Sequence, residues 1–286
     1  MVLQETIDTI TELYGESLKR ITIERIVIGI FFTGVKLSNG YGGVTYTPFA
    51  EIYKGACDAI PLFSKQKIFL YKGMTVHEAL NTVSDAPMLN TVKIIVLNAL
   101  STLFLSNCRY VIAEDCDALD IVDIDPVKKV CMVGTFIPFL ERFKKINGIQ
   151  LRVIERENSS PRGNEIRYYV PDEDAQAIIP LCDTVIISGS AIENGTIDGL
   201  LSYVNRDAMV VIEGPSVSFL PDAFFRRNVN VVSGVSVTRP DKALDMLSEG
   251  MGAYNLFKAR VVKKINVLGR ADDCIGHEYR VAAGGG

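Results

Sequence analysis

The pattern of apolar and polar residues divides the chain into two unlike parts. Up to residue 108 it predicts a helix, an antiparallel meander and further helices, in that order. From residue 109 onward, short apolar runs that end in small polar residues alternate with amphipathic segments. Grouped strands and helices are typical of an α+β unit, and regular alternation is typical of an α/β unit with a parallel sheet. The sequence therefore predicts two domains, residues 1–108 and residues 109–286.

The first part opens with a helical segment and continues with β-branched runs. Apolar side chains recur at helical spacing in residues 1–20, and residues 21–32 have the composition of one or two strands. Asn39-Gly40 lies between VKLS and YGGVTYT, and this dipeptide favours a hairpin turn because both residues tolerate positive φ. These features predict a small antiparallel meander that ends near Phe49.

Helices follow the predicted meander. Residues 50–61 and 75–105 carry helical patterns, and Thr75 with Glu78 forms the capping-box pattern that begins many helices. The segment 89–105 forms the longer helix. Its apolar face could cover the meander or serve a dimer, so a homo-oligomer is one expectation for this chain.

An acidic segment, residues 106–127, separates the two parts. It contains Asp115, Asp117, Asp120, Asp123 and Asp125. Such a group could bind a divalent cation, but the spacing lacks the glycine and the terminal glutamate of a calcium loop. The sequence therefore predicts a solvated linker here.

The second part begins with a strand, a helix and a strand. An apolar run ends at Gly134, and a second run, Leu151 to Ile154, ends at Glu155. Between them, Phe136, Phe139, Leu140 and Phe143 recur at the three- and four-residue spacing of an amphipathic helix. Further apolar runs at 184–187, 208–212, 229–232 and 260–267 continue the alternation. The predicted fold class is α/β: a Rossmann-like, doubly wound parallel sheet preceded by a smaller α+β domain.

The candidate chemistry lies where these strands end. Glycine and hydroxyl side chains follow four of them, in Gly134-Thr135, Ser188-Gly-Ser190, Gly214-Pro-Ser216 and Ser233-Gly234. Short turns between strand and helix require such residues in any case. The carboxyl ends of parallel strands also lie along one edge, however, which is where ligands bind in these folds. The sequence predicts a ligand cleft at this edge.

Two glutamates end strands at the same edge. Glu155 and Glu213 could contact a ribose, ligate a metal, act as acid and base, or be solvated strand ends. Glu155 follows Gly134 at about the 20-residue offset of a ribose-binding acid. The turn GTFIP has one glycine and a proline, however, and so disfavours a dinucleotide. His77 and His277 have no partners at metal-ligand spacing, which excludes a histidine-rich zinc site and a Ser-His-Asp triad.

Composition narrows the functional classes. The chain is 48% hydrophobic and 22% charged, with a net charge of −4, which disfavours nucleic acid as a partner. The longest apolar candidate, residues 94–105, is interrupted by polar residues, so we expect no membrane span. The N-terminus has no basic start, so we expect no signal peptide and a cytoplasmic protein. The six cysteines form no CxxC pair, and Cys131 and Cys182 are expected to be buried thiols.

Several ordered motifs resemble a known family. They are GxxFTGVxLxxGxGGVTYTP, MVGTFIP, LRVIER, VIISGSAIENGTID, VIEGPS, SGVSVTRPD and SEGMG. Together they resemble the heavy-metal chelatase family of bacterial and archaeal proteins, and the likeness covers nearly the whole chain. The resemblance implies an enolase N-terminal-like domain joined to a Rossmann-like domain, with a site in the cleft between them.

The resemblance also implies a function and a set of site residues. The function is metal handling, either chelation of a metal or binding of a chelated one. By motif position, the implied cleft lining is Asn39, Gly40, Gly42, Gly43, Gly134, Thr135, Phe136, Pro138, Glu155, Ser188, Gly189, Ser190, Asn194, Thr196, Gly214, Pro215 and Ser216. These turns carry no cluster of soft-metal ligands, so a small organic chelator or a hard cation fits them better than a bare heavy-metal ion.

Three functional hypotheses follow. The first is binding of a small anionic or metal-chelating ligand in the interdomain cleft, with a divalent or heavy-metal ion as the cofactor. The second is a nucleotide- or S-adenosylmethionine-dependent enzyme, which Glu155 favours and the missing glycines disfavour. The third is a non-catalytic carrier of a metabolite or metallophore, favoured by the lack of an evident catalytic pair. The sequence identifies no catalytic residues.

Overall fold

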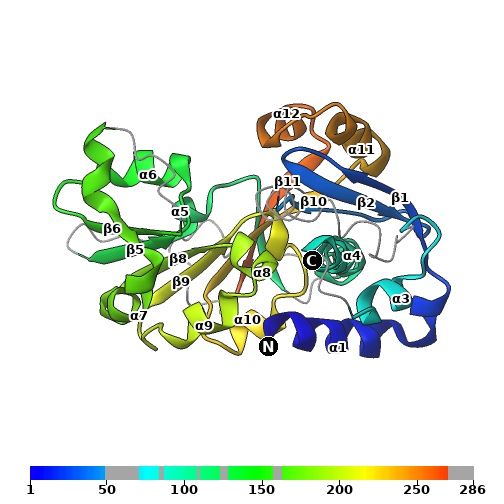
Figure 1. Cartoon of the computed structure of the whole chain (residues 1–286), viewed down its shortest axis with the longest axis horizontal. Helices are drawn as coiled ribbons and strands as arrows, with labels where there is room; N and C mark the ends of the chain where they lie inside the picture. Colours follow the sequence, from blue (N-terminus) through cyan, green and yellow to red (C-terminus); the bar gives the residue numbers. More distant parts are fainter. Residues whose placement is uncertain (49–70, 84–86, 108–109, 123–127, 157–162, 270–286) are drawn as a thin grey trace, which may run out of the picture.

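The computed structural model describes residues 1–48, 71–83, 87–107, 110–122, 128–156 and 163–269 (Figure 1). The helix predicted at 50–61, residue Phe49, Asp123, Asp125 and the C-terminal tail lie outside these residues. Two separate sheets organise the described part: a small antiparallel sheet and a large, mostly parallel one. The predicted class, a doubly wound α/β sheet preceded by a smaller α+β unit, is confirmed.

The small sheet contains β1 (Ile23–Ile28), β2 (Phe32–Leu37) and β3 (Gly42–Tyr46), paired antiparallel in that order. Three helices from the same part of the chain accompany it: α1 (Val2–Tyr14), α3 (Val76–Asn81) and α4 (Pro87–Leu105). The predicted hairpin turn joins β2 to β3, and Asn39 Oδ1 accepts the Tyr41 N–H over 3.3 Å. The predicted capping box begins α3, where Thr75 and Glu78 each cap the backbone N–H of the other.

The large sheet contains the strands β4 (Val111–Glu114), β5 (Lys129–Val133), β6 (Gln150–Glu155), β7 (Tyr169–Pro171), β8 (Thr184–Ser188), β9 (Met209–Glu213), β10 (Val231–Val237) and β11 (Val262–Leu268). Their order in the sheet is β4-β11-β10-β9-β8-β5-β6-β7. Every pair from β10 to β7 is parallel, and β11 is antiparallel to both of its neighbours. The chain extends the sheet outward from β5 in one direction and from β8 in the other. The topological switch point therefore lies between β5 and β8.

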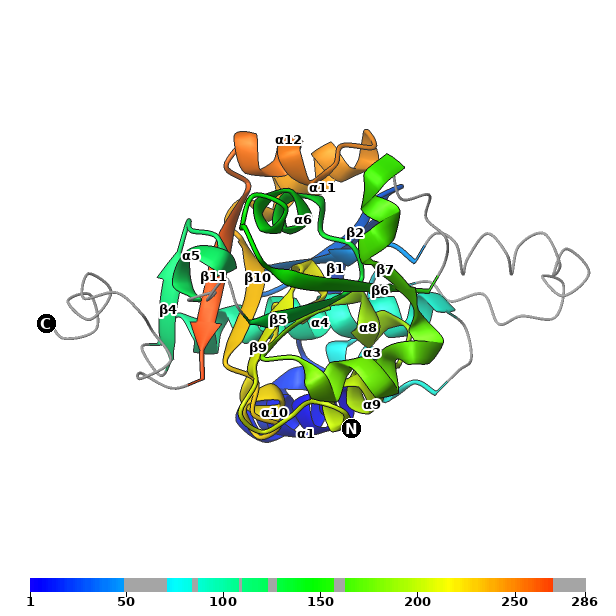
Figure 2. The same ribbon diagram turned by 90° about the vertical axis from the view of Figure 1, so that its left-hand side faces the viewer.

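Short helices cover both faces of the large sheet (Figures 1 and 2). On one face lie α5 (Ala118–Ile121) and α6 (Ile137–Phe143), which bury Phe139, Leu140 and Phe143 against Met132 and Val211. The opposite face packs against α1 and α4 and bears α7 (Ala175–Ile178), α8 (Ser190–Glu193), α9 (Ile197–Ser202) and α10 (Asp222–Phe225). Alternate side chains of each strand thus enter different cores, as parallel sheets require.

Of the last two helices of the second part, the first packs on the small sheet, whereas the second contacts β11 of the large sheet (Figure 1). They are α11 (Pro240–Ser248) and α12 (Ala253–Lys258), and their apolar side chains share a core with Val44. The Lys36–Asp241 and Arg25–Asp245 ion pairs span 3.0 Å and 2.7 Å at the same contact. Helix α4 covers the other face of the small sheet, which is one of the two alternatives that its apolar face left open. A segment distant in sequence therefore completes the small sheet's core.

The prediction of a solvated linker over residues 106–127 is wrong. This segment forms β4 and α5, and Ala113, Leu119 and Ile121 are buried. Asp117 and Asp120 form a capping box at the start of α5, so they are structural caps. The aspartates gave the segment the composition of a linker because caps and turns use the same residues. The short strand β7 was not predicted either.

Helix α4 is a core helix. Its segment Met88–Leu105 is long and apolar enough to cross a membrane by length and composition, but 67% of it is buried inside the protein. Gly43 of β3 packs directly on it. A Cβ at Gly43 would lie 2.1 Å from the carbonyl oxygen of Ile95, so only glycine permits this approach.

Candidate functional site

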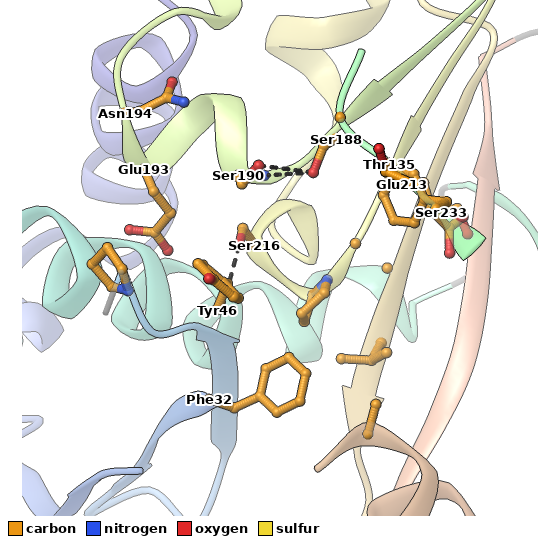
Figure 3. A pocket seen from close by; sticks show the side chains of 18 of the residues that line it. Phe32, Tyr46, Thr135, Ser188, Ser190, Glu193, Asn194, Glu213, Ser216 and Ser233 are labelled. Atoms are coloured by element: carbon orange, nitrogen blue, oxygen red, sulfur yellow. Dashed lines mark hydrogen bonds between the residues drawn. The ribbon is translucent and has the colours of Figure 1, made fainter. Parts of the chain in front are cut away.

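A cavity with a volume of about 630 Å³ lies at the carboxyl ends of the parallel strands. We call it the central cleft. The large sheet contributes the ends of β5, β6, β8, β9 and β10, and the small sheet contributes Phe32 and Tyr46 (Figure 3). Asn90 of α4 and Phe257 of α12 complete the wall. Side chains from both parts of the chain therefore face one space, which is the arrangement that the family resemblance implied.

Glu155 holds the turn that follows β5. Its Oε2 accepts hydrogen bonds from the Thr135 N–H over 3.0 Å and from the Thr135 hydroxyl over 2.9 Å. Its Oε1 accepts the Arg156 N–H over 3.2 Å. Gly134 adopts a φ of 82°, and a Cβ there would lie 2.8 Å from Ser188 Cβ. The conformation and the space both require glycine, and the carboxylate fixes the loop beside it.

The ends of the neighbouring strands form one continuous row. In the register of the sheet, Ser188 lies opposite Glu213, Glu213 opposite Ser233, and Ser233 opposite Asn266. Because side chains alternate along a strand, these four residues share the face that bears α5 and α6. The row is polar although each strand is otherwise apolar there. Ser188, Glu213 and Ser233 reach the central cleft.

Three residues of this region form what we call the open cluster: Glu213, Ser233 and Lys264. Glu213 is only 8% exposed, and its Oε1 lies 2.9 Å from Lys264 Nζ. Among the described residues, Glu213 Oε2 and the hydroxyl of the fully buried Ser233 have no hydrogen-bond partner. Burial raises the pKa of Glu213 above its ordinary value. The Lys264 ammonium offsets part of that rise, as does the Ser233 hydroxyl, which lies close to the carboxylate but does not meet the geometry of a hydrogen bond.

The opposite wall carries what we call the closed cluster: Thr45, Thr91, Glu193 and Ser216. Glu193 accepts the Thr45 hydroxyl over 2.6 Å and the Thr91 hydroxyl over 3.1 Å. Ser216 Oγ lies 2.9 Å from Thr45 Oγ1. Beside this cluster, the buried Asn98 amide donates to the carbonyls of Val44 and Pro215, over 2.8 Å and 2.9 Å. These contacts join the small sheet and α4 to the ends of β8 and β9.

A second, smaller cavity of about 340 Å³ adjoins the central cleft on the side of α8 and α9. The two share lining residues, among them Gly134, Glu155 and Ser188. Beyond them the second cavity is lined by Thr196, Gly199 and Tyr203. Ser188 and Ser190 lie at the junction, with their hydroxyl oxygens 2.8 Å apart (Figure 3).

The donor atoms present do not form a preassembled metal centre. Within the described ranges, no group of three or more His, Cys, Asp and Glu side chains is placed to hold an ion. The carboxylates that reach the central cleft are Glu155, Glu193 and Glu213, and each lies in a different hydrogen-bonded setting. A metal that enters this cleft would have to bring most of its ligands with it.

The structure brings together most of the predicted site residues. The central cleft is lined by Gly134, Thr135, Phe136, Glu155, Ser188, Ser190, Asn194, Gly214, Pro215 and Ser216. Thr196 lines the second cavity instead, and its hydroxyl donates to Asn194 Oδ1 over 2.6 Å. Gly189 lies behind the lining, where its N–H donates to the Glu213 carbonyl, and Pro138 belongs to the first turn of α6.

The glycine-rich hairpin does not line either cavity. Asn39 and Gly40 form the turn at its tip. Gly42 faces Pro240 at the start of α11, and Gly43 faces the backbone of α4. The glycines of this hairpin serve close packing, which produces the same sequence signal as a loop that approaches a ligand.

Sequence reasoning missed Lys264 and Glu193. Lys264 lies in an antiparallel strand that crosses the sheet beside β10, so neither the end of a parallel strand nor a motif marks it. Its strand has two adjacent lysines among apolar residues, so no alternation marks Lys264 as a residue that faces a site. Glu193 lies on the four-residue helix α8, between two turns that the sequence did identify.

Two family profiles, a sequence relative and two crystal structures are similar to this chain. A sequence profile described as "Putative heavy-metal chelation", of the DUF364 family, matches residues 117–266, more than half of the chain. A second profile with the same description, of the DUF4213 family, matches residues 11–101. An uncharacterised protein of Methanocaldococcus jannaschii is 28% identical over 129 residues, covering 45% of this chain and 48% of that protein. The chain thus spans about half the length of this curated relative.

Two crystal structures resemble the whole described fold. A DUF364 protein of unknown function from Pyrococcus horikoshii has a TM-score of 0.71 and 20% identity, covering 94% of this chain and 100% of that one. Another from Desulfitobacterium hafniense DCB-2 has a TM-score of 0.63 and 16% identity, covering 91% and 98%. At these identities the likeness establishes the fold alone.

Proposed function

The chain belongs to the DUF364 family, and from that premise we propose that the central cleft binds a small organic metal chelator or its metal complex. One observation supports this most strongly. The cleft is large and furnished with oxygen donors, yet the described residues contain no cluster that could ligate a bare ion. A metal carried by an organic ligand needs only recognition of that ligand, through shape, hydrogen bonds and charge.

The size and chemistry of the cleft suit a small organic molecule. Its volume of about 630 Å³ falls within the range of small-molecule sites, roughly 300–1,000 Å³. Phe32, Phe136 and Phe257 supply apolar surface, while Ser190 and Asn194 supply hydrogen-bonding groups. The charged lining side chains are Glu155, Glu193, Glu213, Arg156 and Lys264, which carry a net charge of −1 when all are ionised. Arg156 and Lys264 can contact the carboxylates of a chelator, and a glutamate can contact its cationic or hydrogen-bond-donating groups.

The experiment is equilibrium dialysis with metal analysis. The protein is dialysed against Ni²⁺, Cu²⁺ or Zn²⁺ alone, against aminocarboxylate chelators alone, and against the preformed complexes. We expect stoichiometric retention of a chelator or a complex and none of the free ions. Stoichiometric retention of a free ion at a protein site would overturn the proposal, as would the absence of binding across the whole panel.

A pair of variants tests whether a retained ligand binds in the central cleft. Ala253 is an exposed residue of α12 that lines the cleft, so Ala253→Trp should fill the space without disturbing the core. Asn255 is exposed on the same helix and does not line it, so Asn255→Trp is the matched control. We expect Ala253→Trp to abolish retention and Asn255→Trp to preserve it.

A nucleotide- or S-adenosylmethionine-dependent enzyme is the second candidate, and the second cavity favours it. That cavity lies beside the β5–β8 switch point, where Rossmann-like folds hold nucleotides. Glu155 is already bonded to Thr135 and Arg156, which weakens the case for a ribose contact. Gly199 lines this cavity with open space before it, so Gly199→Trp should block it. This candidate requires nucleotide binding that Gly199→Trp abolishes and Ala253→Trp spares.

A carrier without catalytic activity differs from an enzyme in one observation. Incubation of a bound ligand with the protein should return it unchanged, as measured by mass spectrometry. Turnover of the ligand would exclude the carrier.

A further inference from the structure

The open cluster has hydrogen-bonding capacity that the described protein leaves unused. Glu213 Oε2 and Ser233 Oγ are both buried, both belong to residues that line the central cleft, and neither has a partner among the described residues. Leaving a buried polar atom without a partner costs about 1–3 kcal/mol, and more for a charged group. Two such atoms on adjacent strands, at one register position, indicate a site that a ligand completes.

The net charge of the open cluster determines which kind of ligand group can complete the site. The ionised side chains gathered here are Glu213, Lys264 and Asp117, whose carboxylate lies 3.7 Å from Lys264 Nζ. Their sum is −1. The ring of Phe139 lies on the other side of Lys264, 5.7 Å from Nζ, and brings no further charge. One positively charged group would neutralise the cluster.

A metal ion does not suit this position. Hard divalent cations take about six or more oxygen ligands, and Glu213 and Ser233 offer two unused oxygens beside an ammonium group. An amine nitrogen needs only acceptors for its N–H groups. The two unused oxygens are acceptors.

We propose that Glu213 and Ser233 form a subsite for a ligand amine, protonated or metal-bound through its nitrogen, with its N–H groups donated to Glu213 Oε2 and Ser233 Oγ. The inference rests on the proposed function and narrows the ligand to the aminocarboxylates. Lys264, which also lines the cleft, has N–H groups beyond the one it gives to Glu213 and offers them to a carboxylate of the same ligand. Glu213 is then the residue that distinguishes amine-containing chelators from those without nitrogen.

Two probes of nearly the same shape test this. Iminodiacetate carries a secondary amine between two carboxylates, and diglycolate carries an ether oxygen in that position. Both are measured by isothermal titration calorimetry at neutral pH, where the amine is protonated. We expect iminodiacetate to bind the wild-type protein at least about tenfold more tightly, because a hydrogen bond to a charged group is lost with the ether. Glu213→Gln should remove that preference.

Ser233→Ala provides the second variant, because it removes only an atom without a partner and is expected to fold. It should reduce the preference for iminodiacetate without affecting the circular dichroism spectrum. Equal binding of the two probes by the wild-type protein, with both lost in Ala253→Trp, would overturn the amine subsite and leave the proposed function intact. If neither probe binds, the inference fails. The proposed function fails with it only when none of the chelators or complexes in the dialysis panel binds either.

Discussion

Two clusters of carboxylate and hydroxyl groups face each other across the central cleft, and they differ in how completely they are bonded (Figure 3). In the closed cluster, Glu193 accepts from two threonines, and Ser216 contacts one of them. In the open cluster, Glu213 has one oxygen on Lys264 and the other without a partner among the described residues. The residue types are similar. Their bonding indicates that one cluster holds the protein together and that the other is available to a ligand.

The location of each cluster explains the difference. The closed cluster joins β3 and α4 to α8 and to the turn after β9, elements that no shared sheet connects. The open cluster lies on β9, β10 and β11, strands that backbone hydrogen bonds already join. Side-chain bonds are therefore needed for assembly on one side of the cleft only. The other side can retain unsatisfied groups at a cost in stability. Beside the closed cluster, Asn98 Oδ1 also has no partner among the described residues.

The largest effect should come from adding a side chain at the point where β3 packs against α4. The closed cluster depends on this close contact. In Gly43→Ala, the new Cβ would lie 2.1 Å from Ile95 O and 2.8 Å from Ala99 N, both of them backbone atoms. We expect a loss of about 3 kcal/mol in the free energy of unfolding, measured by urea denaturation, or failure to fold. Gly199→Ala, where the space is open, is the control and should cost nothing. Wild-type stability in Gly43→Ala would show that the two elements can separate.

Removal of Lys264 tests the open cluster. Lys264→Met leaves the buried Glu213 carboxyl without its counter-ion. We expect a loss of about 2 kcal/mol at neutral pH, less than for a fully buried pair, because the Lys264 side chain is partly exposed. The double variant Lys264→Met with Glu213→Gln should recover most of it. A double variant no more stable than Lys264→Met alone would show that the cost arises from lost packing of the lysine stem.

Truncation of one hydroxyl in each cluster gives the most direct comparison. Thr45→Val keeps the shape of a fully buried residue but removes the hydroxyl that Glu193 accepts, so we expect a loss of about 1–2 kcal/mol. Ser233→Ala removes a hydroxyl without a partner in the described residues, and its effect should stay within about 0.5 kcal/mol. Both are measured by urea denaturation. Equal losses in the two variants would contradict the distinction between the clusters.

The smallest effect should be a change in pH dependence. Burial raises the pKa of Glu213 in the folded protein above its unfolded value. As pH rises from the unfolded pKa through the folded one, the unfolded state loses the proton first, so this residue lowers the free energy of unfolding over that window. Glu213→Gln should therefore gain stability relative to the wild type as pH rises through the window and hold the gain above it. Thermal melts from acid to neutral pH measure this, and parallel curves would contradict the expected titration.

The sequence alone predicted most of the strands and the turns that follow them, but not β4 or β7. Runs such as TVIIS and VVIEG are apolar enough for strands buried on both faces, and glycine and serine follow where the sheet ends. Ten of the residues assigned to the cleft by motif do line it. The hairpin glycines do not, because a glycine required by a neighbouring backbone and one required by a ligand look the same in sequence.

What only the tertiary structure decided is which polar groups meet. The order of strands, with β11 inserted between β10 and β4, brings Lys264 to Glu213, and no local pattern encodes that contact. Likewise, α11 completes the core of the small sheet although the two are distant in sequence. The periodicity of apolar residues predicts whether a side chain points inward, because burial follows the local alternation along a strand or helix. Whether a buried carboxylate finds its partners depends on long-range packing, and that separates Glu193 from Glu213.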